Sequence, residues 1–309
     1  MRRPADYNAT FDYGRLVAVC GIIWFHAKAP GAVIGYAGLA FFVMLLVQNA
    51  LSQIATVRPQ FHRAPAWVRY AAARAERLLF PWLLACIVYG SFKVVEVAGG
   101  SPWSFEFTPY MWLTGTALHL WFLPFAFLIC IALWPLGRWL RDQPPQVCSG
   151  VAFFCAGTAL LLFNVVQVVG LPVPFAQWAY ALPSVLLGVT FALERQNVTQ
   201  TLGLLTFFCL TALALDLTTG LLEIAIAGAA LALCSNLHLP STGLSRWCGR
   251  VSLWVYLVHP IAMTIIVRGI GVPDGSVLLA VLTTATTLLI VGLSQALGGS
   301  RLHRFALNS

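Results

Sequence analysis

Ten apolar segments of nearly bilayer-spanning length follow one another along this chain and constrain its fold more than any other feature. A helix needs about 20 apolar residues to cross the hydrocarbon core of a membrane. The runs lie at residues 14–33, 36–55, 78–97, 118–137, 148–169, 177–193, 201–216, 221–236, 251–268 and 277–297. Because a chain in lipid must satisfy its own backbone hydrogen bonds, each run is expected to be helical. The predicted fold is all-α, a polytopic membrane protein of about ten transmembrane helices in one domain, 1–309.

The scarcity of charge supports a lipid environment. Only 9% of the 309 residues are Asp, Glu, Lys or Arg, whereas a soluble domain carries about 25%. So few charged groups could not cover the surface of a soluble protein of this size. No polar stretch is long enough to form a separate soluble domain. The lipid bilayer is therefore an expected partner.

The distribution of Lys and Arg predicts the orientation, because cytoplasmic loops of membrane proteins carry an excess of both. With the N-terminus inside and ten spans, 15 of the 18 fall on cytoplasmic ends and loops, and only Lys28, Lys93 and Arg268 fall outside. Both termini are then cytoplasmic. This bias also explains the net charge of +8 without a nucleic-acid partner. For the runs 201–216 and 221–236, one re-entrant pair is the alternative to two spans.

Arg15 and His26, in the first run, are the residues best suited to chemistry. They are eleven positions apart, which brings both side chains to one face of a helix, roughly 16 Å apart along its axis. Arg15 would lie near the cytoplasmic surface and His26 near mid-membrane, where a titratable side chain is costly and a functional candidate. A neutral imidazole can serve as a general base, and an arginine suits a phosphate.

The spacing of Arg15 and His26 fits a long ligand with an anionic head and a reactive tail. Coenzyme A has this form, with phosphates at one end and a thioester on a flexible arm at the other. A histidine that only packs between helices is the alternative for His26.

Five short elements along the chain carry a family resemblance. They are Arg15 to His26 (R-x10-H), Gly38 to Val43, Arg74 to Arg77 (R-x-x-R), His119 to Phe122 and Leu123 (H-L-W-F-L), and Gly249 to Ser252 followed by Tyr256 to His259 (G-x-x-S…Y-L-x-H). In this order, and on a ten-helix plan, they resemble the acyltransferase-3 family of membrane acyltransferases. The chain departs from the family pattern at Met44, Leu45 and Leu46, where members often have Ser-Gly.

The resemblance implies O-acyl transfer, typically of acetyl, from cytoplasmic acyl-CoA to a carbohydrate hydroxyl, as in an exopolysaccharide. It makes His26 the leading catalytic residue and Arg15 its partner, with Arg74 and Arg77 near the donor. The expected co-substrate is acetyl-CoA, with no metal. The acceptor is a glycan or a lipid-linked oligosaccharide. The expected location is the bacterial cytoplasmic (inner) membrane, with a second copy or a partner membrane or periplasmic protein as further candidate partners.

Other polar residues have less certain roles. His119 and Trp121 open the fourth run on the outer side, where His119 is expected to line an acceptor cleft. Trp121 is either an acceptor-binding residue or a member of the interfacial aromatic belt. His259 lies near the start of the ninth run, toward its cytoplasmic half, and is expected to face the donor channel. For both histidines, a core residue with satisfied hydrogen bonds is the alternative.

Three acidic residues complete the candidates. Glu223 and Asp216 lie at the outer edge, where solvation at the interface competes with sugar binding. Asp12 precedes Arg15 by three residues and is placed to orient its guanidinium. The rival function is a transporter of a lipid-linked glycan or an anion, with His26 as a proton relay and the arginines as substrate clamps. A structural membrane subunit is the third reading.

Overall fold

The computed structural model describes residues 8–57, 65–194 and 198–297, and within these ranges it is helical, without strands. Its long helices are α1 (Thr10–His26), α2 (Ala32–Thr56), α3 (Ala66–Ala98), α6 (Phe122–Leu140), α7 (Pro145–Val168), α8 (Phe175–Leu193), α9 (Val198–Ala214), α10 (Leu221–Asn236), α11 (Gly243–Ile265) and α12 (Val277–Leu297). Short elements are α4 (Trp103–Glu106), α5 (Met111–Thr114), the 3-10 turn η1 (Leu118–Trp121) and the π-helical turn η2 (Ile266–Ile270). Each long helix overlaps one of the predicted apolar runs.

Seven helical segments in the described ranges are long and apolar enough to cross a membrane. They contain α2, α3, α6, α7, α8, α11 and α12. The apolar helices α9 and α10 are shorter, with 17 and 16 residues, and α1 also has 17. An all-helical fold with seven candidate spans is therefore shown, and the expected total of ten stays a prediction.

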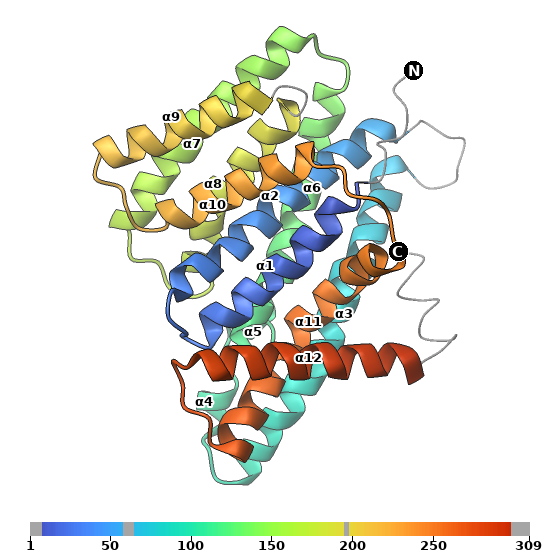
Figure 1. The fold of residues 1–309 in the computed structure, drawn as a ribbon, viewed down its shortest axis with the longest axis vertical. Coiled ribbons are helices and arrows are strands. Elements are labelled where there is room, and N and C mark those ends of the chain that lie inside the picture. The colour runs from blue at the N-terminus through green and yellow to red at the C-terminus, as the bar shows by residue number, and fades with distance from the viewer. Residues whose placement is uncertain (1–7, 58–64, 195–197, 298–309) are drawn as a thin grey trace.

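Helix α2 lies in the middle of the bundle (Figure 1). It packs against α1, α6, α8 and α10, and more than half of its residues are buried. One group of helices, α7 to α10, lies on one side of it, and α3, α11 and α12 lie on the other. Large apolar side chains are exposed along the outer faces, such as Phe80 and Ile87 of α3 and Leu289 of α12. Lipid is the solvent that such faces require.

Glycines bring the backbones of α1 and α2 into contact. A Cβ atom on Gly35 would overlap the carbonyl of Gly21, and one on Gly38 would overlap the carbonyl of Ala18. Helices in lipid associate through such close packing of small residues, because the apolar solvent provides no hydrophobic drive. The contact therefore fixes the position of α1, and of His26 at its end, against α2.

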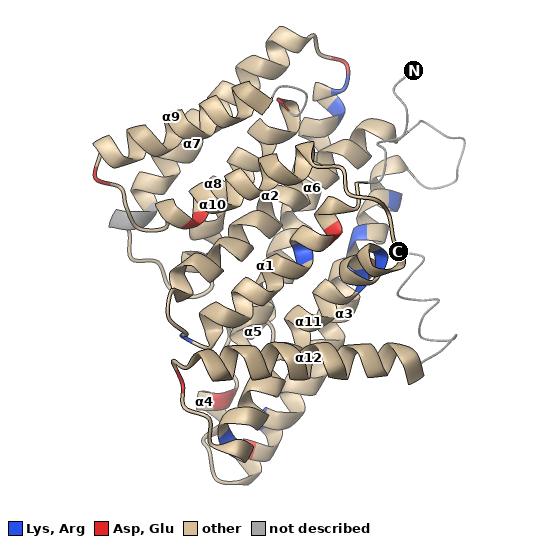
Figure 2. Cartoon of the chain, viewed as in Figure 1, with Lys and Arg blue, Asp and Glu red and all other residues tan. Residues whose placement is uncertain are grey.

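Basic side chains gather at the end of the bundle where α1 begins (Figure 2). There Arg138 and Arg141 donate hydrogen bonds to the backbone carbonyl of Val57, which follows α2. Eight described arginines belong to this end: Arg15, Arg69, Arg74, Arg77, Arg138, Arg141, Arg246 and Arg250. The opposite end holds Lys28, Lys93 and Arg268. Arg2, Arg3, Arg58, Arg63, Arg195, Arg301 and Arg304 lie outside the described residues.

We expect Gly35→Ala to lower the stability of the bundle. The added methyl group must push α1 away from α2, and overpacking of this kind typically costs about 1–3 kcal/mol. Thermal unfolding of the purified protein in detergent measures the effect. Gly157→Ala in α7 is the matched control, because a Cβ there meets nothing within 4 Å. Equal unfolding temperatures for the two variants would contradict the close contact.

Candidate active site

A cavity of about 600 Å³ lies at the end of the bundle where α1 ends. Cavities that bind small molecules have volumes of about 300–1,000 Å³. The walls come from α1, α2, η1, α8, α11 and the segment before α12. Its polar and aromatic lining includes His26, Tyr36, His119, Trp121, Gln177 and His259. The size and lining are those of a site for a small molecule or for one unit of a larger one.

Three histidines from distant parts of the sequence meet in this cavity. The ring centroids of His26 and His259 are 5.2 Å apart, and those of His119 and His259 are 5.6 Å apart. His26 is accessible as the last residue of α1, whereas His259 is fully buried and His119 is nearly so. Within the described parts of the chain, no group of His, Cys, Asp or Glu side chains is arranged to hold a metal ion.

Tyr256 holds two of these histidines in place. Its hydroxyl donates a hydrogen bond to the backbone carbonyl of His119. Its own carbonyl accepts a hydrogen bond of 2.6 Å from Nδ1 of His259, one helical turn later. Tyr89 of α3 adds a bond of 2.8 Å from its hydroxyl to the carbonyl of Leu257. The sequence motif contains Tyr256 but no role was predicted for it, although its spacing of three from His259 was an available signal.

His119 and Trp121 line the cavity together with His26. Trp121 is only 6% exposed, so the interpretation as an interfacial belt residue is wrong. The depth predicted for His259 is also wrong. Helix α11 begins at Gly243, eight residues before the expected 251, and this places His259 past its middle, toward the cavity.

Arg15 is not among the residues that line the cavity. It lies nearer the basic end of α1, where its Nη1 is 2.7 Å from Oδ1 of the buried Asp12. The predicted contact between Asp12 and Arg15 is thus confirmed. A Cβ on Gly249 of α11 would overlap the Asp12 carboxylate, which therefore needs a glycine opposite it. This contact explains the glycine of the G-x-x-S element and holds the ion pair between α1 and α11.

Arg74 and Arg77 have different surroundings, although their spacing predicts a shared helix face. Arg74 is buried, donates a hydrogen bond to Oε1 of Gln53, and lies over the ring of Tyr70 at 5.0 Å from its centroid. Arg77 is exposed. Neither lines the cavity. Of the two, only Arg77 can reach a ligand without first breaking a contact inside the protein.

Glu223 lies behind the cavity wall. It is buried in the first turn of α10, close to the side chain of Tyr180. The Tyr180 ring lies 5.5 Å from that of Tyr36, which does line the cavity. Gly220 makes room for Tyr180, because a Cβ there would lie 2.8 Å from the ring. Burial excludes the solvated position predicted for Glu223, whereas Asp216 is exposed in the turn before α10.

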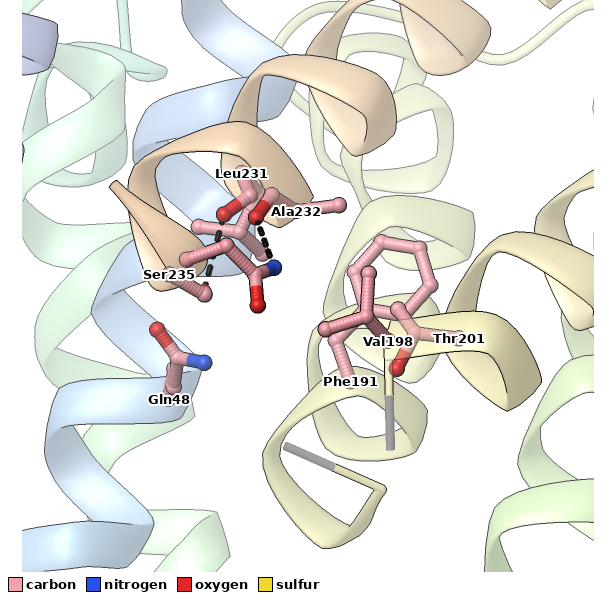
Figure 3. Close-up of a pocket in the computed structure, with 8 residues that line it drawn as sticks. Gln48, Phe191, Val198, Thr201, Leu231, Ala232 and Ser235 are labelled. Atoms are coloured by element: carbon pink, nitrogen blue, oxygen red, sulfur yellow. Dashed lines mark hydrogen bonds between the residues drawn. The ribbon is translucent and has the colours of Figure 1, made fainter. Parts of the chain in front are cut away.

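A second void lies between α2, α8, α9 and α10 near the basic end (Figure 3). Gln48 faces it, while the side chain of Ser235 bonds to a carbonyl of its own helix. Its volume is about 10 Å³, which is room for about one water molecule. This void is too small for a substrate, so the histidine cavity is the candidate active site.

A comparison with known protein families shows the family of the chain. The chain matches a family described as "Acyltransferase domain" over residues 8–296. A bundle of apolar, membrane-spanning helices with this match is a membrane-bound acyltransferase. In particular, the chain belongs to the acyltransferase-3 family, as the motif resemblance predicted. No curated protein and no solved structure gave a significant match.

We expect Tyr256→Phe to destabilise the cavity. The variant leaves the buried carbonyl of His119 without its donor, and an unsatisfied buried polar group costs about 1–3 kcal/mol. Thermal unfolding measures this loss. Tyr110→Phe is the control, because the Tyr110 side chain is 48% exposed. If both variants unfold like the wild type, Tyr256 does not support His119.

Proposed function

We propose that the chain is an O-acyltransferase that transfers an acyl group, most simply acetyl, from cytoplasmic acyl-CoA to a hydroxyl of a cell-surface glycan. The observation that carries the proposal is the position of His26. In a chain of the acyltransferase-3 family, this histidine ends α1 inside a cavity large enough for a sugar unit. The acceptor is an exopolysaccharide, another cell-surface glycan or its lipid-linked precursor.

The two ends of α1 suit the two ends of acyl-CoA. Arg15 and the exposed Arg77 belong to the basic end, which the positive-inside rule places in the cytoplasm. A guanidinium binds phosphate through paired, charge-assisted hydrogen bonds. His26 lies at the other end of the same helix, roughly 16 Å along the axis from Arg15 at 1.5 Å per residue. The pantetheine arm of the donor would bridge this separation and bring the thioester to His26.

The transfer itself needs one base and one leaving group. His26 removes the proton from the acceptor hydroxyl as the oxygen attacks the thioester carbonyl carbon. The carbon–oxygen bond forms, the carbon–sulfur bond breaks, and the CoA thiolate leaves and takes up a proton. In the two-step alternative, the His26 nitrogen accepts the acyl group first and then passes it to the hydroxyl. Both routes require an uncharged His26.

The same proposal includes a membrane, an orientation in it and possible partners. The chain would form one acyltransferase domain in the bacterial cytoplasmic membrane. Both ends of the helix bundle would meet water, with the basic end in the cytoplasm. The cavity, at the opposite end, would then receive the acceptor from the outer side. A second copy of the chain or a periplasmic partner would be needed only to deliver the glycan.

We expect His26→Ala to abolish acyl transfer, with a loss of at least about 100-fold, because general-base catalysis typically contributes 10²–10⁴-fold. The measurement is the incorporation of radiolabelled acetyl from acetyl-CoA into surface glycans of cells with equal amounts of protein. His238→Ala is the control, since His238 is exposed near the basic end, outside the cavity. Undiminished incorporation in the His26→Ala variant would exclude His26 as base or acyl carrier.

We expect Arg15→Lys to weaken donor binding more than the chemical step. Lysine keeps the positive charge but cannot form the paired hydrogen bonds of a guanidinium. A lost charge-assisted hydrogen bond of about 1.5–3 kcal/mol corresponds to a rise in the KM for acetyl-CoA of about tenfold or more. Arg246→Lys, at the exposed start of α11, is the control. An unchanged KM in the Arg15→Lys variant would remove Arg15 from the donor site.

A further inference from the structure

Several buried polar atoms of the cavity lining lack a hydrogen-bond partner. Three buried polar side-chain atoms of its lining residues have no hydrogen-bond partner: Nε2 of His119, Nε2 of His259 and Oε1 of Gln177. Buried polar atoms are normally paired, and each unpaired one needs an explanation. A ligand that fills the cavity would supply the missing partners. The chemistry of the three atoms therefore indicates which ligand fits.

His259, a residue of the cavity lining, has an unpaired hydrogen-bond acceptor. Its Nδ1 lies 2.6 Å from the carbonyl of Tyr256, which can only accept, so Nδ1 must carry the proton. A neutral imidazole has one N–H, and a charged ring without a counterion is unfavourable in a buried site. The Nε2 atom of His259 then carries no proton, and its lone pair can accept a hydrogen bond.

His119 and Gln177 give the cavity two further acceptors. The Nε2 atom of His119 is also buried and has no hydrogen-bond partner. In the neutral tautomer with the proton on Nδ1, this Nε2 atom accepts a hydrogen bond, as Nε2 of His259 does. The amide oxygen Oε1 of Gln177 is an acceptor by nature. His259 and Gln177 thus require hydrogen-bond donors from the ligand, and a hydroxyl also suits His119, since it can donate or accept.

Hydroxyl groups meet this requirement better than ammonium groups. The charged residues of the lining, Arg268 and Asp274, have ion-pair partners of their own in Glu96 and Lys28. An ammonium ion in the cavity would therefore lack a free counter-charge, and its desolvation would not be compensated. Trp121 and Tyr36 also offer ring surfaces to the apolar faces of a ligand. A polyhydroxylated ring has both features.

We propose that His119, His259 and Gln177 form a hydroxyl-binding subsite that orients a polyhydroxylated acceptor by accepting hydrogen bonds from it. Because a hydroxyl donates only one hydrogen bond, separate hydroxyls of the acceptor bind to these atoms, while another, the one to be acylated, reaches His26. The inference rests on the proposed acyl transfer for its kinetic test, but it assigns a separate role. His26 reacts, and the subsite decides which molecules bind and which hydroxyl faces His26.

The test uses His259→Asn and His119→Asn in the purified full-length protein. The amide nitrogen of asparagine can replace Nδ1 of histidine and keep the bond to the Tyr256 carbonyl, whereas nothing replaces Nε2. The probes are the methyl glycosides of glucose, galactose and mannose, with acetyl-CoA as donor. Release of CoA is followed with and without glycoside, and glycoside binding is followed by saturation-transfer NMR. His238→Asn, whose Nδ1 also lies near a backbone carbonyl, is the matched control.

We expect both cavity variants to raise the KM for the glycoside at least about tenfold and to weaken the glycoside binding seen by NMR to a similar extent. The control should behave like the wild type in both assays. An unchanged KM, or an equal fall of transfer and of CoA release at constant KM, would overturn the subsite. If the wild type neither binds nor acylates any glycoside, the subsite is likewise overturned.

Two further results distinguish loss of the subsite from misfolding of a variant and from failure of the proposed function. Glycosides with one hydroxyl replaced by fluorine, which cannot donate, should fail on the unaltered protein at the acylated ring position and at the ring positions whose hydroxyls the subsite binds. Failure at a single position would contradict the subsite even if the variants do not fold. If NMR binding is lost in His259→Asn although the wild type transfers no acyl group, the subsite stands and the proposed function fails.

Discussion

The rest of the structure depends on the contact between the backbones of α1 and α2. Gly21 and Gly35 meet without side chains between them, and Gly38 meets Ala18 in the same way. In lipid there is no hydrophobic effect to bring helices together. The van der Waals attraction of this close approach holds α1 and α2 together instead. Because α1 ends at His26, the contact also determines where this histidine lies. Stability and the geometry of the site have the same origin here.

Helix α11 provides the second constraint on α1, at both of its ends. Near the basic end, Gly249 accommodates the Asp12 carboxylate that holds Arg15. Near the cavity, His259 packs against His26. The backbone carbonyl of Tyr256 holds the His259 ring in place through a hydrogen bond. One pair of helices therefore carries both the anion-binding end and the reactive end of the proposed site. A rigid connection of this kind suits a reaction in which a long donor must bring its thioester to a fixed base.

The unpaired acceptors of the cavity connect packing with specificity. Burying polar atoms without partners costs free energy, and Nε2 of His119 and Nε2 of His259 are buried without a partner in the protein. A ligand with suitably placed hydroxyls removes this cost when it binds. A molecule of the same shape without donors would not, and sites built in this way reject such analogues strongly. The polar lining, more than the volume, would then select the acceptor.

The sequence by itself determined the all-helical plan, because apolar runs in a chain so poor in charge can only be helices in lipid. It also determined the family, through motifs that include Arg15 and His26, whose common helix follows from local periodicity. Only the tertiary structure decided that His119 and His259 join His26 and that Arg74 points inward to Gln53. Such contacts join segments far apart in the chain, and they depend on where helices begin and how they cross. Neither is contained in the spacing of residues within one run.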